Sequence, residues 1–187
     1  MGDPFDLTEL RIRQPGKVLP ERATYEIFDN RRRRVADVKE IKGRSRLEAL
    51  AQEVPNVRTF AVTKARREPL LTLVMRGEWL AEISDPGGRP IGRIRVAASR
   101  RQYTMLDDEE TVAGEAAGDL SVTKFAVSGP AGETYAQFRK TWAGLRKELF
   151  TQSDNYKLTV TGLVPPRVRP LIVMLPVVVD ISVHGPY

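Results

Sequence analysis

The sequence predicts a mainly β protein whose strands close into a barrel, and two observations lead to this prediction. The first is a repeated unit in which two segments of alternating apolar and polar residues flank a short polar turn. The second is the number of such segments, roughly a dozen, which exceeds what an open twisted sheet usually carries without curling or splitting. Closure into a barrel removes the exposed edge strands that such a sheet would keep.

Four hairpins supply most of the predicted strands. Their turns are rich in Asp, Asn, Gly and Pro, which provide turn angles, and the alternation on either side places one face of each strand on the core. The paired segments are 24–28 with 35–39, 80–84 with 91–96, 103–106 with 111–115, and 125–128 with 133–138. Further strands are expected at 57–64, 70–75 and 157–161.

The remaining segments are less regular. Residues 1–22 are predicted to form an ordered lead-in with one short strand near Leu10–Arg13, followed by a single barrel domain over residues 23–187. A short helix is predicted at 47–53. Residues 135–150 are ambiguous, because 145–150 has the propensity of a helix whereas 135–140 continues a strand by alternation.

The chain is most apolar near its end, where every residue from Leu171 to Val179 is apolar or proline. This run is shorter than the about 20 residues that cross a bilayer, so we expect it inside the core. Its β-branched residues favour a strand, and Pro176 would kink a helix. However, about 14 residues without a turn signal exceed a usual strand. The residues alone leave strand and helix open.

The order of four short motifs resembles the phospholipid scramblase and LURP-one-related families, which share the Tubby-like C-terminal fold. The motifs are Pro90-Ile-Gly after a proline-glycine turn, Lys140-Thr-Trp-Ala-Gly-Leu-Arg-Lys-Glu-Leu-Phe-Thr, Asp154-Asn-Tyr, and the apolar segment ending Val179-Asp-Ile. The resemblance extends from about Thr24 to Val183 and is that of a bacterial-type member. It implies about twelve strands closed around a central hydrophobic helix at 169–183. The residues implied for that helix include Leu171, Val173, Met174, Leu175, Val178, Val179 and Asp180.

Asp180 would then be a carboxylate near the C-terminus of a buried helix, where the helix dipole is unfavourable to it. A buried carboxylate needs hydrogen-bond donors. We expect backbone amides at the barrel mouth or an arginine to supply them, and we expect the role of Asp180 to be structural.

No catalytic constellation is found in the sequence. Cysteine is absent, which excludes thiolate catalysis and Cys-rich zinc sites. His184 is the only histidine, and no cysteine or second histidine is available as its partner, so we expect it to face solvent after the apolar segment. A barrel filled by its own helix also has little interior volume for a substrate. The acidic run 107–110 lies at a turn and lacks the ligand spacing of a calcium loop. We therefore predict a protein that is not an enzyme.

Calcium responsiveness is not expected to follow from the resemblance. Where the scramblases carry an acidic segment before the last helix, this chain has Gln152, Ser153, Asp154 and Asn155, so one expected carboxylate is a glutamine. Asp154 and Asn155 are thus weak metal candidates, and we predict no cofactor. The cysteine clusters and proline-rich leader of the scramblases are also absent, which argues against constitutive membrane anchoring.

Charge gives the main indication of a ligand. The formal net charge is +6, and a basic surface attracts phosphate groups. Each cation near an anionic membrane contributes only about 1 kcal/mol, so several must act together. The candidate residues for binding lipid or another anion are Arg31, Arg32, Arg33, Arg34, Arg66, Arg67, Arg93, Arg95, Arg100 and Arg101, with Arg44 and Arg46 as a further pair.

The predicted function is a non-enzymatic barrel that binds anionic phospholipid headgroups, or another anionic ligand, through these arginines. The alternative is a protein-interaction or structural module without a role in lipid binding. Such a module could also associate with nucleic acid through the same charge. Aromatic residues amount to 7% and do not alternate with the basic pairs, which argues against nucleic-acid stacking. The N-terminus shows no secretory signal, so we expect a cytoplasmic protein, peripheral at the inner face of the membrane.

Overall fold

The computed structural model describes residues 3–15, 23–42, 57–64, 68–141 and 155–184. Within these ranges it contains twelve strands, one long helix and a short 3-10 helix. Their bounds are η1 (Pro4–Asp6), β1 (Glu9–Arg13), β2 (Thr24–Asp29), β3 (Arg34–Lys42), β4 (Val57–Lys64), β5 (Pro69–Arg76), β6 (Leu80–Ser84), β7 (Pro90–Val96), β8 (Gln102–Asp107), β9 (Val112–Gly118), β10 (Lys124–Ser128), β11 (Thr134–Lys140), β12 (Asn155–Val160) and α2 (Arg169–His184).

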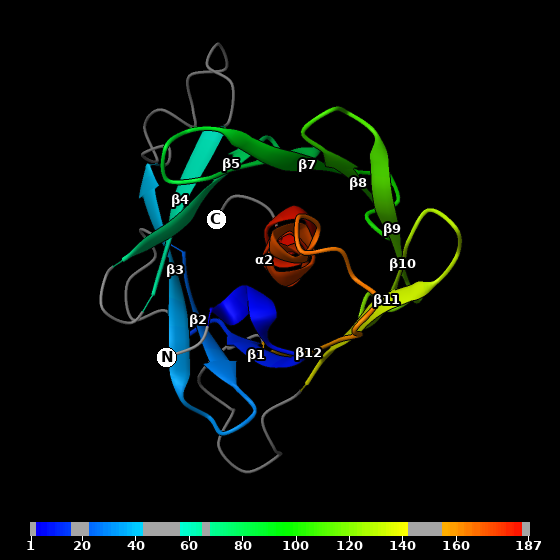
Figure 1. The fold of residues 1–187 in the computed structure, drawn as a ribbon. Coiled ribbons are helices and arrows are strands. Elements are labelled where there is room, and N and C mark those ends of the chain that lie inside the picture. Colours follow the sequence, from blue (N-terminus) through cyan, green and yellow to red (C-terminus); the bar gives the residue numbers. More distant parts are fainter. Residues whose placement is uncertain (1–2, 16–22, 43–56, 65–67, 142–154, 185–187) are drawn as a thin grey trace.

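The strands form one closed antiparallel barrel. Each strand pairs with its neighbours in sequence, and the pairing of β1 with β12 closes the wall (Figure 1). The closed barrel of about twelve strands is therefore confirmed. The short strand expected in the lead-in is β1, and it is one of the twelve strands of the wall.

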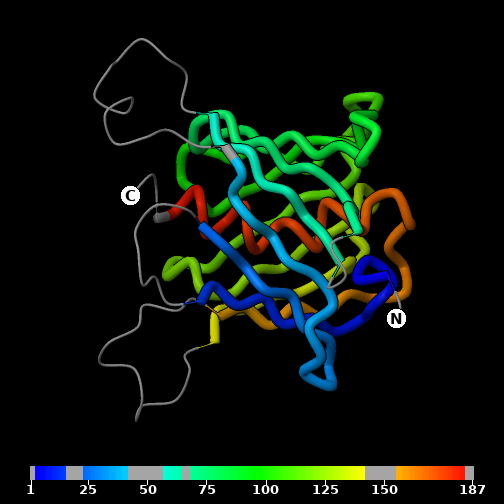
Figure 2. Tube along the Cα trace, turned by 90° about the vertical axis from the view of Figure 1, so that its left-hand side faces the viewer, coloured from blue at the N-terminus to red at the C-terminus, as the bar shows by residue number. Residues whose placement is uncertain are grey.

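Helix α2 lies along the inside of the barrel (Figures 1 and 2). Residues 171–180 are all buried, which explains why the segment is apolar on every side. The central helix implied by the resemblance at 169–183 is confirmed and ends one residue later, at His184. All seven residues named for it lie in α2.

The residues alone left strand and helix open for this segment, with β-branched propensity favouring a strand. The structure shows a helix, and backbone hydrogen bonding explains why. In the middle of a closed barrel no neighbouring strand is available, so a strand would leave its backbone N–H and C=O groups buried without partners. A helix satisfies these groups within itself. Pro176 lies inside α2 at a cost of about 3 kcal/mol. Burying each large apolar side chain contributes about 1.5–3 kcal/mol, which outweighs that cost.

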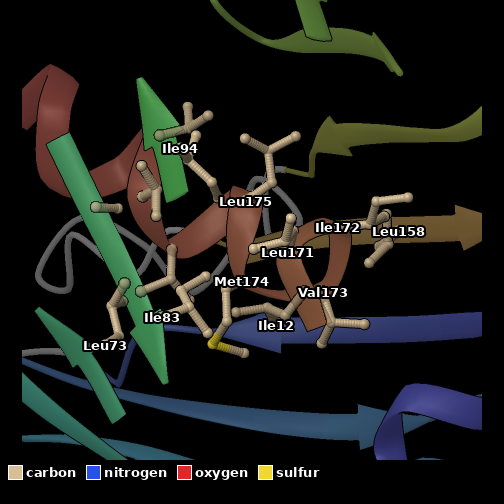
Figure 3. Close-up of a cluster of buried hydrophobic side chains, with 14 of the residues drawn as sticks. Ile12, Leu73, Ile83, Ile94, Leu158, Leu171, Ile172, Val173, Met174 and Leu175 are labelled. Atoms are coloured by element: carbon tan, nitrogen blue, oxygen red, sulfur yellow. The ribbon is translucent and has the colours of Figure 1, made fainter. Parts of the chain in front are cut away.

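The core is made by the inward faces of the strands and the whole surface of α2. Figure 3 shows Ile12, Leu73, Ile83, Ile94 and Leu158, which come from five different strands, around Leu171–Leu175. Gly92 of β7 allows a close approach here. A Cβ added to it would lie 2.3 Å from the carbonyl oxygen of Leu106 and 3.1 Å from Leu171. This gives a physical reason for glycine in the Pro90-Ile-Gly motif.

The barrel has two ends. We call the end where α2 begins the proximal end and the end where α2 finishes the distal end (Figure 2). Because the strands alternate in direction, the β2–β3, β6–β7, β8–β9 and β10–β11 turns lie at the proximal end, and the β5–β6, β7–β8 and β9–β10 turns at the distal end.

Several turns share one device, an aspartate that ends or follows a strand. Asp29, Asp85, Asp107 and Asp119 each accept hydrogen bonds on the side chain from backbone N–H groups two to five residues later. Asp107, the first residue of the predicted acidic turn, is one of them and is buried.

Of the predicted helix at 47–53 and the ambiguous segment 135–150, the structure describes only a part. Residues 135–140 form most of β11, as alternation predicted. Residues 47–53 and 145–150 lie outside the described part of the chain.

Candidate anion-binding surface

The distal end of the barrel interior contains a cluster of hydrogen-bonded polar side chains around Asp180. The hydroxyl groups of Tyr25 and Tyr156 donate to the two carboxylate oxygens at 2.8 and 3.1 Å. The hydroxyls of Tyr103 and Ser182 lie 3.0 Å apart. Burial and then the nearby Asp180 carboxylate raise the pKa of Tyr25 well above its ordinary value, so this phenol stays protonated and remains a donor.

This cluster ties the last turns of α2 to β2, β8 and β12. The donors Tyr25 and Tyr156, which were not predicted from the sequence, lie 155 and 24 residues away from Asp180 in the chain. Because α2 occupies the barrel interior, a ligand site is expected on the outer surface.

The run Arg31–Arg34 lies in the β2–β3 turn at the proximal end. Its second half is ion-paired. Arg33 lies 2.7 Å from Asp29, and Arg34 lies 3.0 Å from Glu26 and also contacts Asp37. Arg31 and Arg32 are exposed, and no carboxylate of the described residues pairs with their side chains.

Arg93 and Arg95 lie on one outward face of β7, as their spacing predicted. That face carries its own carboxylates. Glu110 contacts Arg93 and lies 3.3 Å from Arg95, while Glu82 of β6 lies 3.8 Å from Arg93. We call these four residues the paired face.

Arg100 and Arg101 lie in the β7–β8 turn at the distal end. Arg100 pairs with Glu78, and its guanidinium group lies 5.6 Å from the centre of the Trp79 ring. This turn and the β2–β3 turn lie at opposite ends and on opposite sides of the wall, so the predicted arginines do not form one face (Figure 1).

Of the other predicted positions, the structure describes only Asn155. Arg44, Arg46, Arg66, Arg67 and Asp154 lie outside the described residues, and Asn155 is the first residue of β12.

The structure instead aligns four cations that are scattered in the sequence. Lys124 of β10 is the register partner of Arg139 of β11, Arg139 is the partner of Lys157 of β12, and Lys157 is the partner of Arg11 of β1. All four lie at outward positions of their strands. We call Lys124, Arg139, Lys157 and Arg11 the cation row.

The cation row is poorly neutralised. Lys157 lies 3.6 Å from Glu9, and no described carboxylate forms an ion pair with Lys124, Arg139 or Arg11. Like charges directly opposite each other on neighbouring strands are destabilising. A row of four such positions is therefore a feature that stability alone does not favour.

An open groove of about 350 Å³ lies over three members of the row. Lys124, Arg139 and Lys157 line it together with Gln137 and Thr159. Gln137 and Thr159 are register partners of each other and lie two residues along the strands from Arg139 and Lys157. Three cations with an amide and a hydroxyl are groups that can bind phosphate oxygens. In the sequence, these cations are visible only as single basic residues within alternating segments. The strand register is what shows that they are neighbours.

The comparisons with known proteins agree with the fold. A family model described as Scramblase matches residues 50–184. The chain belongs to the scramblase family. A solved X-ray structure of a protein from Arabidopsis thaliana has a TM-score of 0.59 at 14% sequence identity, and the match covers 98% of this chain and 97% of that one. At that identity the likeness concerns the fold. No curated protein sequence matches this scramblase-family chain.

Two further findings bear on the family's chemistry. Among the described residues of this scramblase-family protein, no three His, Cys, Asp or Glu side chains gather where they could hold a metal ion. In the same part of the chain, no helix has the length and hydropathy needed to span a bilayer.

Proposed function

We propose that this scramblase-family protein is a non-enzymatic barrel that binds anionic phospholipid headgroups at a membrane surface through cations on its outer wall. The observation that carries the proposal is the cation row, in which Lys124, Arg139, Lys157 and Arg11 are consecutive register partners. We infer a cytoplasmic protein that associates peripherally with the membrane and needs no cofactor.

The physical support comes from charge density. Successive strands are about 4.8 Å apart, so the row places four positive charges within a distance comparable to a few lipid headgroups. Each cation near an anionic membrane contributes about 1 kcal/mol. The groove over the row adds Gln137 and Thr159 as neutral hydrogen-bonding groups. The exposed Arg31 and Arg32, with which no described carboxylate forms an ion pair, would add a weaker contact elsewhere.

The alternative function is a protein-interaction or structural module that uses the same charge without lipid. It predicts no affinity for vesicles of any composition. Association with nucleic acid predicts instead a binding constant for DNA that falls steeply as salt rises.

The test is co-sedimentation with vesicles of phosphatidylcholine alone and of phosphatidylcholine with phosphatidylglycerol, at low and moderate salt. We expect binding only to the anionic vesicles and a decrease with salt. The variant Lys124→Ala/Arg139→Ala/Lys157→Ala should lower the partition constant about 100-fold, because three contributions of about 1 kcal/mol are removed.

The matched control is Arg33→Ala/Arg93→Ala/Arg95→Ala, which removes the same formal charge from ion-paired positions. It should retain most of the binding. Arg31→Ala/Arg32→Ala should cause a loss of severalfold at most. Equal losses in the two triple variants would show that only net charge matters and would overturn the assignment of the row.

A further inference from the structure

The β9–β10 turn, which directly precedes the cation row, presents an apolar tip. Leu120 is 87% exposed, the largest exposed fraction among the described large hydrophobic side chains. Four residues later the chain reaches Lys124, the first member of the row. An exposed leucine next to a cluster of cations has the composition of a surface that meets both the acyl region and the headgroups of a bilayer.

The turn holds this tip firmly. Asp119 accepts hydrogen bonds from the backbone N–H groups of Thr123 and Lys124 at 2.7 and 3.1 Å. It also accepts from the hydroxyl groups of Ser121 and Thr123. Leu120 therefore projects from an ordered turn. Because the backbone of this turn is already ordered, burying Leu120 in a partner costs little additional conformational entropy.

The neighbouring distal turn adds to the positive charge on this side of the barrel. Arg101 lies in the β7–β8 turn, and its backbone carbonyl accepts from the N–H of Gly118 at the end of β9. At the proximal end, by contrast, the exposed hydrophobic residue Val112 follows the acidic residues Asp108, Glu109 and Glu110, all exposed. An anionic membrane would be repelled by that part of the proximal end and attracted by the distal corner at β9–β12.

We infer that the barrel docks on an anionic bilayer by its distal corner, with Leu120 entering the interface while Lys124, Arg139 and Lys157 bind headgroup phosphates. This inference rests on the proposed function and adds to it an orientation and an inserting residue. Trp79 is 48% exposed in the β5–β6 turn, which lies at the same distal end but beyond the β7–β8 turn in the strand order. It would stay outside the membrane when the corner docks and would enter it if the barrel docked end-on.

The chain has no cysteine, so single cysteines can be labelled cleanly. We would prepare Leu120→Cys, Trp79→Cys and Leu163→Cys and attach a polarity-sensitive fluorophore to each. Leu163 is the matched control, because it is also an exposed leucine, 68% accessible, but follows β12 at the proximal end. Each sample is mixed with phosphatidylcholine/phosphatidylglycerol vesicles, and pelleting is measured on the same samples.

We expect a blue shift and a severalfold rise in emission for the label at position 120, with little change at positions 79 and 163. Pelleting with an unchanged label at position 120 would overturn the inserting tip and leave lipid binding intact. Equal shifts at positions 120 and 79 would replace the corner with end-on docking. Absence of pelleting for the unlabelled protein would overturn the proposed function and this inference with it. As a second variant, Leu120→Asp should lower the partition constant about tenfold.

Discussion

Two basic surfaces of the barrel differ in what surrounds their cations. On the paired face, Arg93 and Arg95 share Glu110, and Arg93 also approaches Glu82. On the cation row, four cations face one another across three pairs of strands, and Glu9 is the described carboxylate that reaches them. The density of arginine in the sequence is higher around the paired face and the β2–β3 turn. The comparison shows that cross-strand carboxylates, more than local arginine content, decide which cations are held in ion pairs.

The strongest way to remove the difference is to give the row its own carboxylates. Gln137→Glu/Thr159→Glu places two acids on the same strands as Arg139 and Lys157, two residues along, and removes no cation. We expect the partition constant on anionic vesicles to fall about 10- to 100-fold, because each added charge offsets about 1 kcal/mol. Co-sedimentation measures it.

The control for that variant is Thr104→Glu. Thr104 is the register partner of Arg95, so the new acid lies on the paired face. Binding should change little. If Thr104→Glu weakened binding as much as the double variant, the two surfaces would not differ in the way described.

The reverse change should turn the paired face into a second binding surface. Glu82→Gln/Glu110→Gln releases Arg93 and Arg95 from their partners. We expect up to about tenfold tighter binding to anionic vesicles, since two cations become available. The same assay measures this, and unchanged binding would mean that free arginines alone do not make a site.

The two surfaces should also contribute to stability with opposite sign. Arg139→Gln relieves repulsion between cross-strand cations and should raise the free energy of unfolding by a few tenths of a kcal/mol, up to about 1 kcal/mol. Arg93→Gln should lower it by about 0–1 kcal/mol, because it removes a surface ion pair. Urea unfolding at low salt measures both changes, and added salt should reduce both. A loss of stability in Arg139→Gln would contradict the repulsion.

The smallest expected effect concerns pH at the turn that leads into the row. The backbone N–H groups of Thr123 and Lys124 hold the pKa of Asp119 well below its ordinary value. A carboxylate with a lowered pKa stabilises the fold above its unfolded pKa, and this contribution is lost as pH falls through the folded pKa. Stability should therefore decline below about pH 4, and less steeply in Asp119→Asn. Identical pH profiles of thermal unfolding for the two proteins would contradict this role.

Most strands were predictable from the sequence because each hairpin is a local pattern. Alternation and turn residues located β2 with β3, β6 with β7, β8 with β9 and β10 with β11. The helix α2 was not predictable from propensity, because its conformation is decided by the absence of a strand to pair with at the barrel axis. A resemblance in four motifs was needed to anticipate it.

The surface was less predictable than the fold. The register that brings residues 11, 124, 139 and 157 together depends on the closure of β1 on β12, which no local pattern reports. The predicted arginine run, by contrast, is followed and preceded by acids, and Asp29 and Asp37 could have been recognised as partners of Arg33 and Arg34. Tyr25 and Tyr156 escaped notice for the same reason as the row, since their link to Asp180 exists only in the folded chain.

The position of α2 in the chain also has a consequence for biosynthesis. Every strand of the wall precedes α2 in the sequence. All twelve amphipathic strands therefore leave the ribosome before the helix that fills the barrel. Neighbouring strands can pair as local hairpins at once, but their inner faces stay exposed to water until translation reaches residues 169–184. During that interval the nascent chain is at its most vulnerable to aggregation. Synthesis that stops before α2 should therefore yield a chain that requires chaperones, whereas one that includes α2 can complete its core in a single late step.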